Sequence, residues 1–143
     1  VTIVAVSHMV LQAVQAAESL ARDGIEAQVI DPRSLRPLDS GLICQSAART
    51  RRLIIVDTGW RSYGVSAEIA ARASEELWDV LKAPIRRVAL PDVPTPASTA
   101  LETAYYPGAR EIVAVVKQCF EAPTAVGTDG IAPSDPKEFE GPF

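Results

Sequence analysis

The sequence contains few side chains that bind metal ions or act as nucleophiles. It has one histidine and two cysteines among 143 residues. His8 has no second imidazole with which to share a metal ion and no obvious nucleophile nearby, so we interpret it as a structural or interface residue. Cys44 and Cys119 are too few and too far apart for a zinc site, and both lie in helical patterns. We expect free thiols in a reducing compartment and predict no metal-binding or catalytic residue.

Long apolar runs and concentrated positive charge are also missing. No stretch of 18 apolar residues occurs, and the short apolar segment at the start lacks the basic flank of a signal peptide. The net charge is −4, and only Arg49, Arg51 and Arg52 stand close together, which we assign to the end of a helix. A nucleic-acid-binding protein would need more lysine and arginine side chains gathered on one surface. We therefore predict a cytoplasmic protein that binds neither membranes nor nucleic acid.

A glycine-rich loop follows the apolar run LIIVD, but it lacks the lysine of a phosphate-binding loop. Gly59 and Gly64 have the spacing of that motif, and a helical pattern follows them. The motif needs Lys and then Ser or Thr directly after its second glycine, because these side chains contact the phosphates and magnesium. Val65 and Ser66 stand there instead. We therefore do not expect a nucleotide site.

Asp57 ends the same apolar run, which is where the phosphoacceptor lies in signalling receiver domains. That chemistry also needs an acidic pair after the first strand and a lysine after a late strand. Ser7 and His8 follow the first expected strand, and Lys82 follows a helix. We interpret Asp57 as a residue that caps or orders its own loop.

Apolar strand-like runs alternate with helical patterns along most of the chain. We expect strands over residues 2–6, 25–30, 53–57 and 85–90, and helices over 9–22, 40–49, 64–81 and 109–120. This alternation predicts the α/β class, as a three-layer α/β/α domain with a mostly parallel sheet. In the first helix we expect Val10, Val14, Ala17 and Ala21 to form the apolar stripe, with Ser7 as the cap and Gly24 as the stop.

Further positions can be assigned within the other elements. Asp39 is expected to cap the helix that follows it, and the three prolines of residues 91–98 exclude a helix or a central strand there. The third helix should bury Ile69, Ala73, Leu77 and Val80 or Leu81, and the last one Ile112, Val116, Cys119 and Phe120.

The chain divides into a folded part and a tail. We assign residues 1–121 to one domain and residues 122–143, rich in proline, glycine and acids, to an extended tail or linker. Val1 stands inside a strand-like run without a preceding methionine, so we expect a fragment of a longer protein.

The loops at the carboxyl ends of the strands are the expected functional positions of such a sheet. These loops carry Arg33, Trp60, Arg61, Tyr63 and Asp92. Arginine and aromatic side chains on exposed loops are common anchors of protein interfaces, whereas no convergent acid, base or nucleophile accompanies them. We predict that these five residues form an assembly surface.

The order of these segments closely resembles the C-terminal domain of the transketolase superfamily, over about residues 1–121. More narrowly, it resembles the β subunit of thiamine-diphosphate-dependent 2-oxo acid dehydrogenases of the pyruvate, acetoin or branched-chain type. Two strings carry the resemblance. The first is D-x-R-S-L-x-P-L-D (Asp31, Arg33, Ser34, Leu35, Pro37, Leu38, Asp39), and the second is A-P-I-x-R-V…P-D-x-P-x-P, from Ala83 to Pro96.

The resemblance implies that thiamine diphosphate and magnesium bind in the parent enzyme and not in this domain. In the family the cofactor lies between the α subunit and the N-terminal domain of the β subunit. The resemblance implies that this C-terminal domain contacts those two partners and supports an α2β2 heterotetramer. In some members of the family the domain also docks to the acyltransferase core of a multienzyme complex. In the family the glycine-rich turn lets a helix start close to the sheet and binds no phosphate. The isolated domain should therefore be inactive.

Some residues depart from the family pattern, and other interpretations stay open. Ser7, His8 and Met9 stand where Gly-Arg-Met is usual, and Asp57 and Thr58 replace a Glu or His followed by a small residue. One alternative is a stand-alone module that binds a small anion through Arg33, Arg36 and Arg61. Another is the same domain from transketolase, 1-deoxyxylulose-phosphate synthase or pyruvate:ferredoxin oxidoreductase. The sequence does not indicate which 2-oxo acid the parent enzyme would use.

Overall fold

A computed structural model describes residues 1–121 of the chain. Its elements follow in the order β1 (Thr2–Ala5), α1 (Met9–Arg22), β2 (Gln28–Ile30), α2 (Ser40–Thr50), β3 (Leu53–Trp60), α3 (Val65–Leu77), β4 (Arg86–Leu90), α4 (Thr99–Tyr105) and α5 (Ala109–Glu121). The tail predicted over residues 122–143 lies outside the described part.

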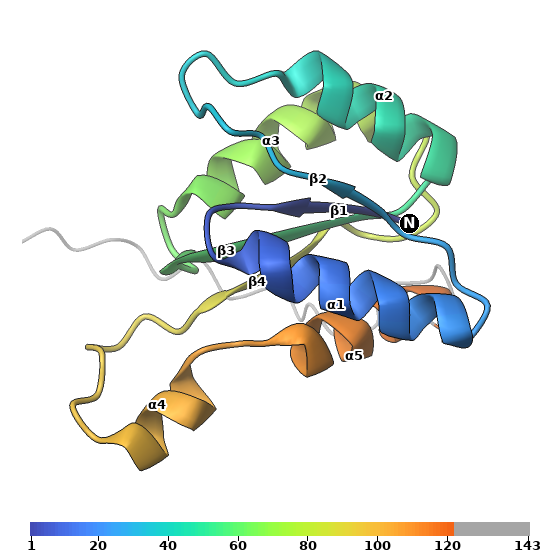
Figure 1. Cartoon of the computed structure of the whole chain (residues 1–143). Helices are drawn as coiled ribbons and strands as arrows, with labels where there is room; N and C mark the ends of the chain where they lie inside the picture. The colour runs from blue at the N-terminus through green and yellow to red at the C-terminus, as the bar shows by residue number, and fades with distance from the viewer. Residues whose placement is uncertain (122–143) are drawn as a thin grey trace, which may run out of the picture.

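The four strands form a parallel sheet in the order β2-β1-β3-β4 (Figure 1). The central strands β1 and β3 are apolar and buried on both faces over Thr2–Ala5 and 53–56, as a parallel sheet covered by helices requires. Because all strands run the same way, their carboxyl ends meet at one edge, to which the loops after β1, β2, β3 and β4 belong. We call this the carboxyl edge and the opposite side the amino edge.

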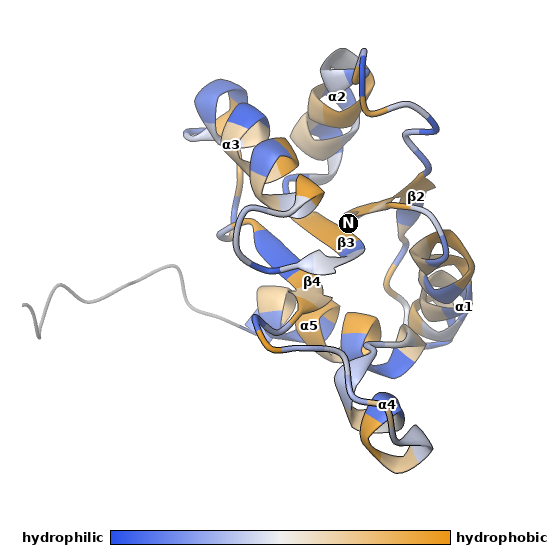
Figure 2. Ribbon diagram, turned by 90° about the vertical axis from the view of Figure 1, so that its left-hand side faces the viewer, coloured by the Kyte–Doolittle hydropathy of each residue, from blue (hydrophilic) through white to orange (hydrophobic). Residues whose placement is uncertain are grey.

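Helices cover both faces of the sheet, so the predicted three-layer arrangement is confirmed. One core joins β1 and β3 to α1 and α5 through residues such as Ile3, Ile54 and Ile112. The other core joins the same strands to α2 and α3, and it includes Val4 and Ile55. Neighbouring residues of one strand thus enter different cores, because side chains alternate across a sheet. Figure 2 shows the apolar strands between the two layers, with α4 standing apart from them.

The apolar stripe predicted for α1 is wrong, and so is its cap. The helix buries Met9, Ala13, Ala16 and Leu20, whereas Val14 is 43% exposed. Ser7 has a left-handed backbone, with φ of 58°, and His8 occupies the N-cap without a side-chain bond to the helix. The buried stripe is thus shifted by one residue toward the start of the helix from the predicted one.

Other element boundaries also differ from the predictions. β3 continues past Asp57 to Trp60, across an irregularity in its pairing with β4 between Val56 and Trp60. β2 is shorter than residues 25–30, and α3 ends at Leu77 although its stripe of Ile69, Ala73 and Leu77 is confirmed. The helix α4 was not predicted.

Several capping and stop positions are confirmed. The Asp39 carboxylate accepts a hydrogen bond from the Leu42 amide at 2.9 Å and so caps α2. Gly24 has φ of 77° just after α1, which is the left-handed conformation that glycine adopts easily. Residues 91–98 contain neither helix nor strand.

Candidate assembly surface at the carboxyl edge

The extension of β3 places Trp60 and the loop after it at the carboxyl edge. The Arg61 amide donates to the Leu90 carbonyl at 2.8 Å, and the Arg87 guanidinium donates to the Arg61 carbonyl at 2.7 Å. These two bonds hold the loop backbone against the end of β4. Trp60 is nevertheless 58% exposed, and Tyr63 is fully exposed. The backbone is thus fixed while two aromatic side chains stay in solvent.

The Asp92 carboxylate is bound by the same loop. It accepts hydrogen bonds from the Ser62 amide at 2.9 Å and from the Ser62 hydroxyl at 2.7 Å. These bonds stabilise the charged form, so they hold the pKa of Asp92 below its ordinary value, and the cations Arg61 and Arg87 add to this effect. A carboxylate held ionised in this way is a poor proton donor, and its role is to tie the loop after β4 to the loop after β3.

Between these two loops lies a hollow of about 330 Å³, which we call the aromatic hollow. It is lined by Trp60, Ser62, Tyr63, Asp92, Val93 and Pro94. Val93 is exposed like the two aromatic residues. The aromatic hollow therefore brings together three of the five predicted interface residues, with Arg61 in the loop beside them. The sequence analysis missed Ser62, Val93 and Pro94, although an apolar valine among prolines in a surface loop was a visible cue.

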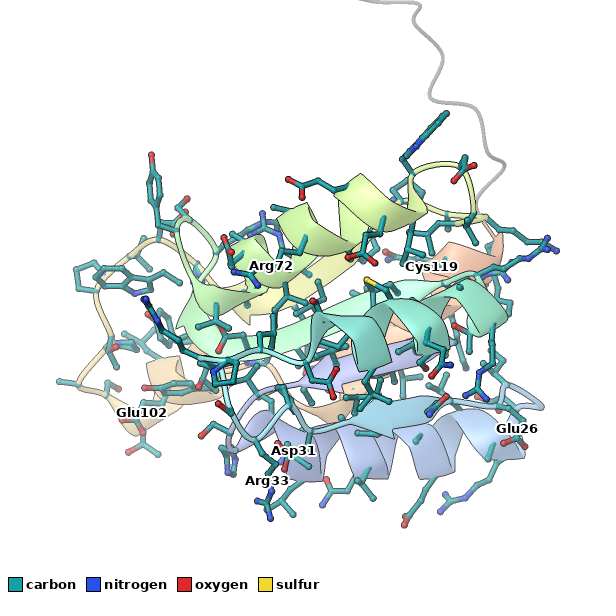
Figure 3. The ribbon with its side chains drawn as sticks, turned by 90° about the horizontal axis from the view of Figure 1, so that it is seen from above. Glu26, Asp31, Arg33, Arg72, Glu102 and Cys119 are labelled. Carbon is teal, nitrogen blue, oxygen red and sulfur yellow. The ribbon has the colours of Figure 1, made fainter. Side chains whose placement is uncertain are left out.

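Arg33 lies in a second hollow of about 610 Å³, on the loop after β2. Its amide donates to the Asp31 carboxylate at 3.0 Å, and its guanidinium lies 3.5 Å from the same group (Figure 3). The structure thus does not place Arg33 around the aromatic hollow.

In the hollows found among residues 1–121, the three arginines of the anion-binding alternative are not grouped together. Arg36 lines a hollow of about 500 Å³ together with Arg72, whose guanidinium pairs with Glu68 at 2.7 Å. Arg33 lines the hollow beside β2, and Arg61 lies beside β4. Each arginine therefore belongs to a different part of the carboxyl edge.

The amino terminus of α3 is closed by a carboxylate of the protein. Asp57 is buried, and its Oδ2 accepts from the Ser66 amide at 3.4 Å. This confirms that Asp57 orders its own loop. A Cβ at Gly64 would overlap the Trp60 carbonyl oxygen, so the glycine lets the helix begin close to the end of β3. The Asp57 side chain thus lies at the helix terminus, which is where phosphate-binding loops hold a phosphate.

Residues 1–121 contain no group of three His, Cys, Asp or Glu side chains that could hold a metal ion. No helix among the same residues is long and apolar enough to cross a membrane.

Neither cysteine is a reactive thiol at neutral pH. Both are free and buried, and they belong to different cores. Burial, helped by the nearby Glu76, raises the pKa of Cys44 to about 11, and burial also raises the pKa of Cys119. His8 is exposed at the start of α1.

Comparison with known proteins identifies the family. Residues 1–112 match the family described as Transketolase, C-terminal domain. The chain is 45% identical over 123 residues to pyruvate dehydrogenase E1 component subunit beta-1, mitochondrial, of Arabidopsis thaliana, a match covering 85% of this chain and 34% of the relative. It is 42% identical to acetoin:2,6-dichlorophenolindophenol oxidoreductase subunit beta of Bacillus subtilis, covering 86% of this chain and 36% of that protein.

A solved structure shows the same fold. It is titled split gene transketolase, inactive beta4 tetramer, and it superposes with a TM-score of 0.68 at 31% identity, covering 84% of this chain and 38% of that chain. The present chain spans about a third of the length of the curated relatives it matches. These matches and the parallel three-layer fold agree, and the chain belongs to the transketolase C-terminal domain family.

Proposed function

We propose that this chain is the C-terminal domain of the β subunit of a thiamine-diphosphate-dependent 2-oxo acid dehydrogenase, and that it supports subunit assembly. The names of the relatives, which include pyruvate dehydrogenase and acetoin oxidoreductase β subunits, support this assignment. The parent enzyme would carry out oxidative decarboxylation and acyl transfer, with thiamine diphosphate and magnesium held by other domains. In this proposal the enzyme works in the cytoplasm.

One observation carries the assembly role: exposed aromatic and apolar side chains surround a hollow that contains no catalytic set. Trp60, Tyr63 and Val93 are held on loops whose backbones are fixed to β4 and to each other. Large apolar side chains on a fixed backbone lose little conformational entropy on binding, and they are favoured as interface anchors. The carboxylate in the hollow is already bound by Ser62.

The partners that fit this surface are the other domains of the same enzyme. We propose that the N-terminal domain of the β subunit and the α subunit cover the carboxyl edge within an α2β2 heterotetramer. The acyltransferase core of a multienzyme complex is a further partner in this proposal. In this proposal the isolated domain holds no cofactor and does not turn over substrate.

Replacement of the anchors in the full β subunit tests the proposal. Trp60→Ala combined with Arg61→Ala should weaken association with the α subunit by about 2 kcal/mol or more, because buried Trp and Arg anchors dominate interface energies. Sedimentation velocity of the reconstituted enzyme measures this loss.

Trp78→Ala is the matched control, since Trp78 is 80% exposed but follows α3 at the amino edge. It should leave the heterotetramer intact. An intact heterotetramer with lost turnover in the Trp60 and Arg61 variant would mean that the loop serves the active site and not assembly.

A further inference from the structure

The aromatic hollow contains a negative charge that the proposed assembly role leaves without a partner. Its lining residues are Trp60, Ser62, Tyr63, Asp92, Val93 and Pro94. Asp92 is the charged residue among them, and it is exposed. The hydrogen bonds from Ser62 hold the pKa of Asp92 below its ordinary value, so the carboxylate is negative at neutral pH. A partner that covered the hollow with apolar groups alone would bury this charge unpaired, at a cost in free energy. Assembly over this surface therefore requires a positive group from the partner.

The Asp92 carboxylate is held in a fixed orientation and can accept further hydrogen bonds. Its Oδ1 accepts from the Ser62 amide at 2.9 Å, and its Oδ2 accepts from the Ser62 hydroxyl at 2.7 Å. An ionised carboxyl group offers about four acceptor positions, so roughly two are left after these bonds. The ion pairs found among residues 1–121 use other carboxylates, namely those of Asp23, Asp31, Glu68 and Glu111. Asp92 therefore offers an oriented acceptor to a donor from outside this part of the chain.

Two cations of the chain itself act on Asp92 without lining the hollow. Arg61 and Arg87 add to the lowering of the Asp92 pKa that Ser62 causes, but neither belongs to the lining residues. The Arg87 guanidinium donates to the Arg61 carbonyl at 2.7 Å, so it is bound to the backbone of the loop. The space beside the carboxylate is thus left for another side chain.

Aromatic rings in the same hollow add a second preference for a cation. Trp60 is 58% exposed and Tyr63 is fully exposed, and both line the hollow together with Asp92. The face of a tryptophan or tyrosine ring attracts cations, and arginine makes this contact more often than lysine. The volume of about 330 Å³ lies at the lower end of the range of about 300–1,000 Å³ for ligand sites, so the hollow suits a single side chain.

We propose that the aromatic hollow receives an arginine side chain of the α subunit, whose guanidinium pairs with Asp92 and stacks on Trp60 and Tyr63. This inference rests on the proposed assembly function and adds the chemistry of the partner. Arginine fits better than lysine because its planar fork bonds two acceptors while its face covers an aromatic ring. A separate subunit lacks the high effective concentration of a linked domain, so it depends more on such anchors.

A titration of the 143-residue chain with N-acetyl-arginine methylamide, followed by NMR, tests the site. The chain has two tryptophans, of which Trp60 lines the hollow and Trp78 follows α3 at the amino edge. The indole N–H signal of Trp60 should shift saturably, with a dissociation constant of about 1–10 mM, because the probe makes one ion pair and one stacking contact. The Trp78 signal should not move. The neutral isostere N-acetyl-citrulline methylamide should shift neither signal.

Asp92→Asn separates the charge of the site from its shape. The asparagine keeps an acceptor for Ser62 but cannot pair with a guanidinium, so the affinity for the probe should fall at least about fivefold. Asp31→Asn is the matched control, because Asp31 lies at the same edge but lines the hollow of Arg33, and this variant should bind the probe as the wild type does. The proposal is overturned by a Trp60 shift that the citrulline probe reproduces or that Asp92→Asn leaves unchanged. It is also overturned if about 50 mM arginine probe gives no saturable shift.

Assembly of the full β subunit with its α subunit then tests the source of the arginine. Asp92→Asn should weaken this association at least about tenfold in sedimentation velocity, because the partner's charge is left unpaired. Asp79→Asn, next to Trp78 at the amino edge, should leave it unchanged. If Trp60→Ala with Arg61→Ala weakens association and Asp92→Asn does not, the assembly function stands and the arginine contact is wrong. If neither variant weakens it, the assembly function itself is wrong and this inference fails with it.

Discussion

At the scale of single residues, Gly64 and Asp57 show why a phosphate-loop spacing occurs without a phosphate site. The glycine is required because the Trp60 carbonyl lies where its Cβ would be, and the amino terminus of α3 is satisfied by the Asp57 carboxylate. The same two features, a glycine and an anion at a helix terminus, also build phosphate sites. Here the group at the helix terminus is a side chain of the protein, so the spacing indicates close packing of a helix on a strand.

Gly64→Ala should therefore destabilise the domain. The added methyl group overlaps a backbone atom that cannot rotate away, and relief requires movement of β3 or α3. We expect a loss of about 1–3 kcal/mol in the free energy of unfolding, as for other overpacked sites. Urea denaturation followed by far-UV circular dichroism measures it.

Gly41→Ala is the control for this prediction. Gly41 lies in α2, where a Cβ would meet only the Asp39 carboxylate at 3.7 Å, an ordinary contact. Alanine should stabilise this helix by about 0.5–1 kcal/mol. Equal midpoints for the two variants would show that the close approach at Gly64 does not exist in solution.

The Ser62–Asp92 pair makes a second residue-scale prediction. The hydrogen bonds from Ser62 lower the pKa of Asp92, so they stabilise the folded state above the ordinary carboxyl pKa of about 4, and this contribution is lost as the pH falls through the lowered value. Ser62→Ala removes the hydroxyl bond but keeps the amide bond. The pKa of Asp92 should therefore rise part of the way toward its ordinary value.

A pH titration of the Asp92 side-chain carboxyl carbon by NMR measures this change. Ser74→Ala is the control, because the Ser74 hydroxyl donates to the Ala70 carbonyl within α3 and has no contact with Asp92. An Asp92 titration that is identical in wild type and Ser62→Ala would contradict the hydrogen bond.

At the scale of elements, α5 and α1 show which helix faces can be predicted from sequence. In α5 charged residues separate Ile112, Val116 and Cys119 from the other face, and the predicted stripe is correct apart from Phe120, which lies exposed under Arg52. In α1 alanines and aliphatic residues occur almost all round the helix, so periodicity alone does not select a face. Packing against the sheet and α5 makes that choice, and it favours the small Ala13 and Ala16.

The boundaries missed at the carboxyl edge also depend on tertiary contacts. The strand pattern of β3 stops at Asp57, yet the strand continues because Trp60 pairs with Leu90 of β4. The helix α4 is short, and it is anchored by the Tyr105 hydroxyl, which donates to the Val93 carbonyl at 2.9 Å. Neither contact is visible in local periodicity.

Helix capping, in contrast, follows from local sequence and can be tested on its own. Asp39→Ala should cost about 1 kcal/mol of stability, because it removes the acceptor for the Leu42 amide at the start of α2. Ser98→Ala is the comparison, since Ser98 occupies the N-cap of α4 without a side-chain cap bond. It should change the free energy of unfolding by less than about 0.5 kcal/mol. Thermal unfolding of both variants measures these changes in stability. Equal losses of stability in the two variants would show that the Asp39 side chain does not cap α2.

At the scale of the whole molecule, the layers and the meeting of the loops at the carboxyl edge could be predicted, but the grouping of side chains could not. The alternation of strands and helices fixes a parallel sheet, and a parallel sheet places all its carboxyl-end loops together. The separation of Arg33 from the aromatic hollow depends on the positions of β2 and β4 at opposite sides of the sheet. The order of the strands in the sheet is set by long-range packing, so it cannot be predicted from the sequence pattern of single strands.

The same architecture leads to the prediction that the isolated chain does not bind thiamine diphosphate. A diphosphate needs free backbone amides or cations together with ligands for its magnesium ion. In the described domain the amino terminus of α3 is occupied by Asp57, and no cluster of metal ligands accompanies it. Calorimetric titration of the 143-residue chain with thiamine diphosphate and magnesium should give no saturable heat, whereas the full β subunit assembled with its α subunit, the positive control, should give a binding curve. Saturable binding to the isolated chain in the micromolar range would show that this domain carries a phosphate site, and its assignment to assembly alone would then be wrong.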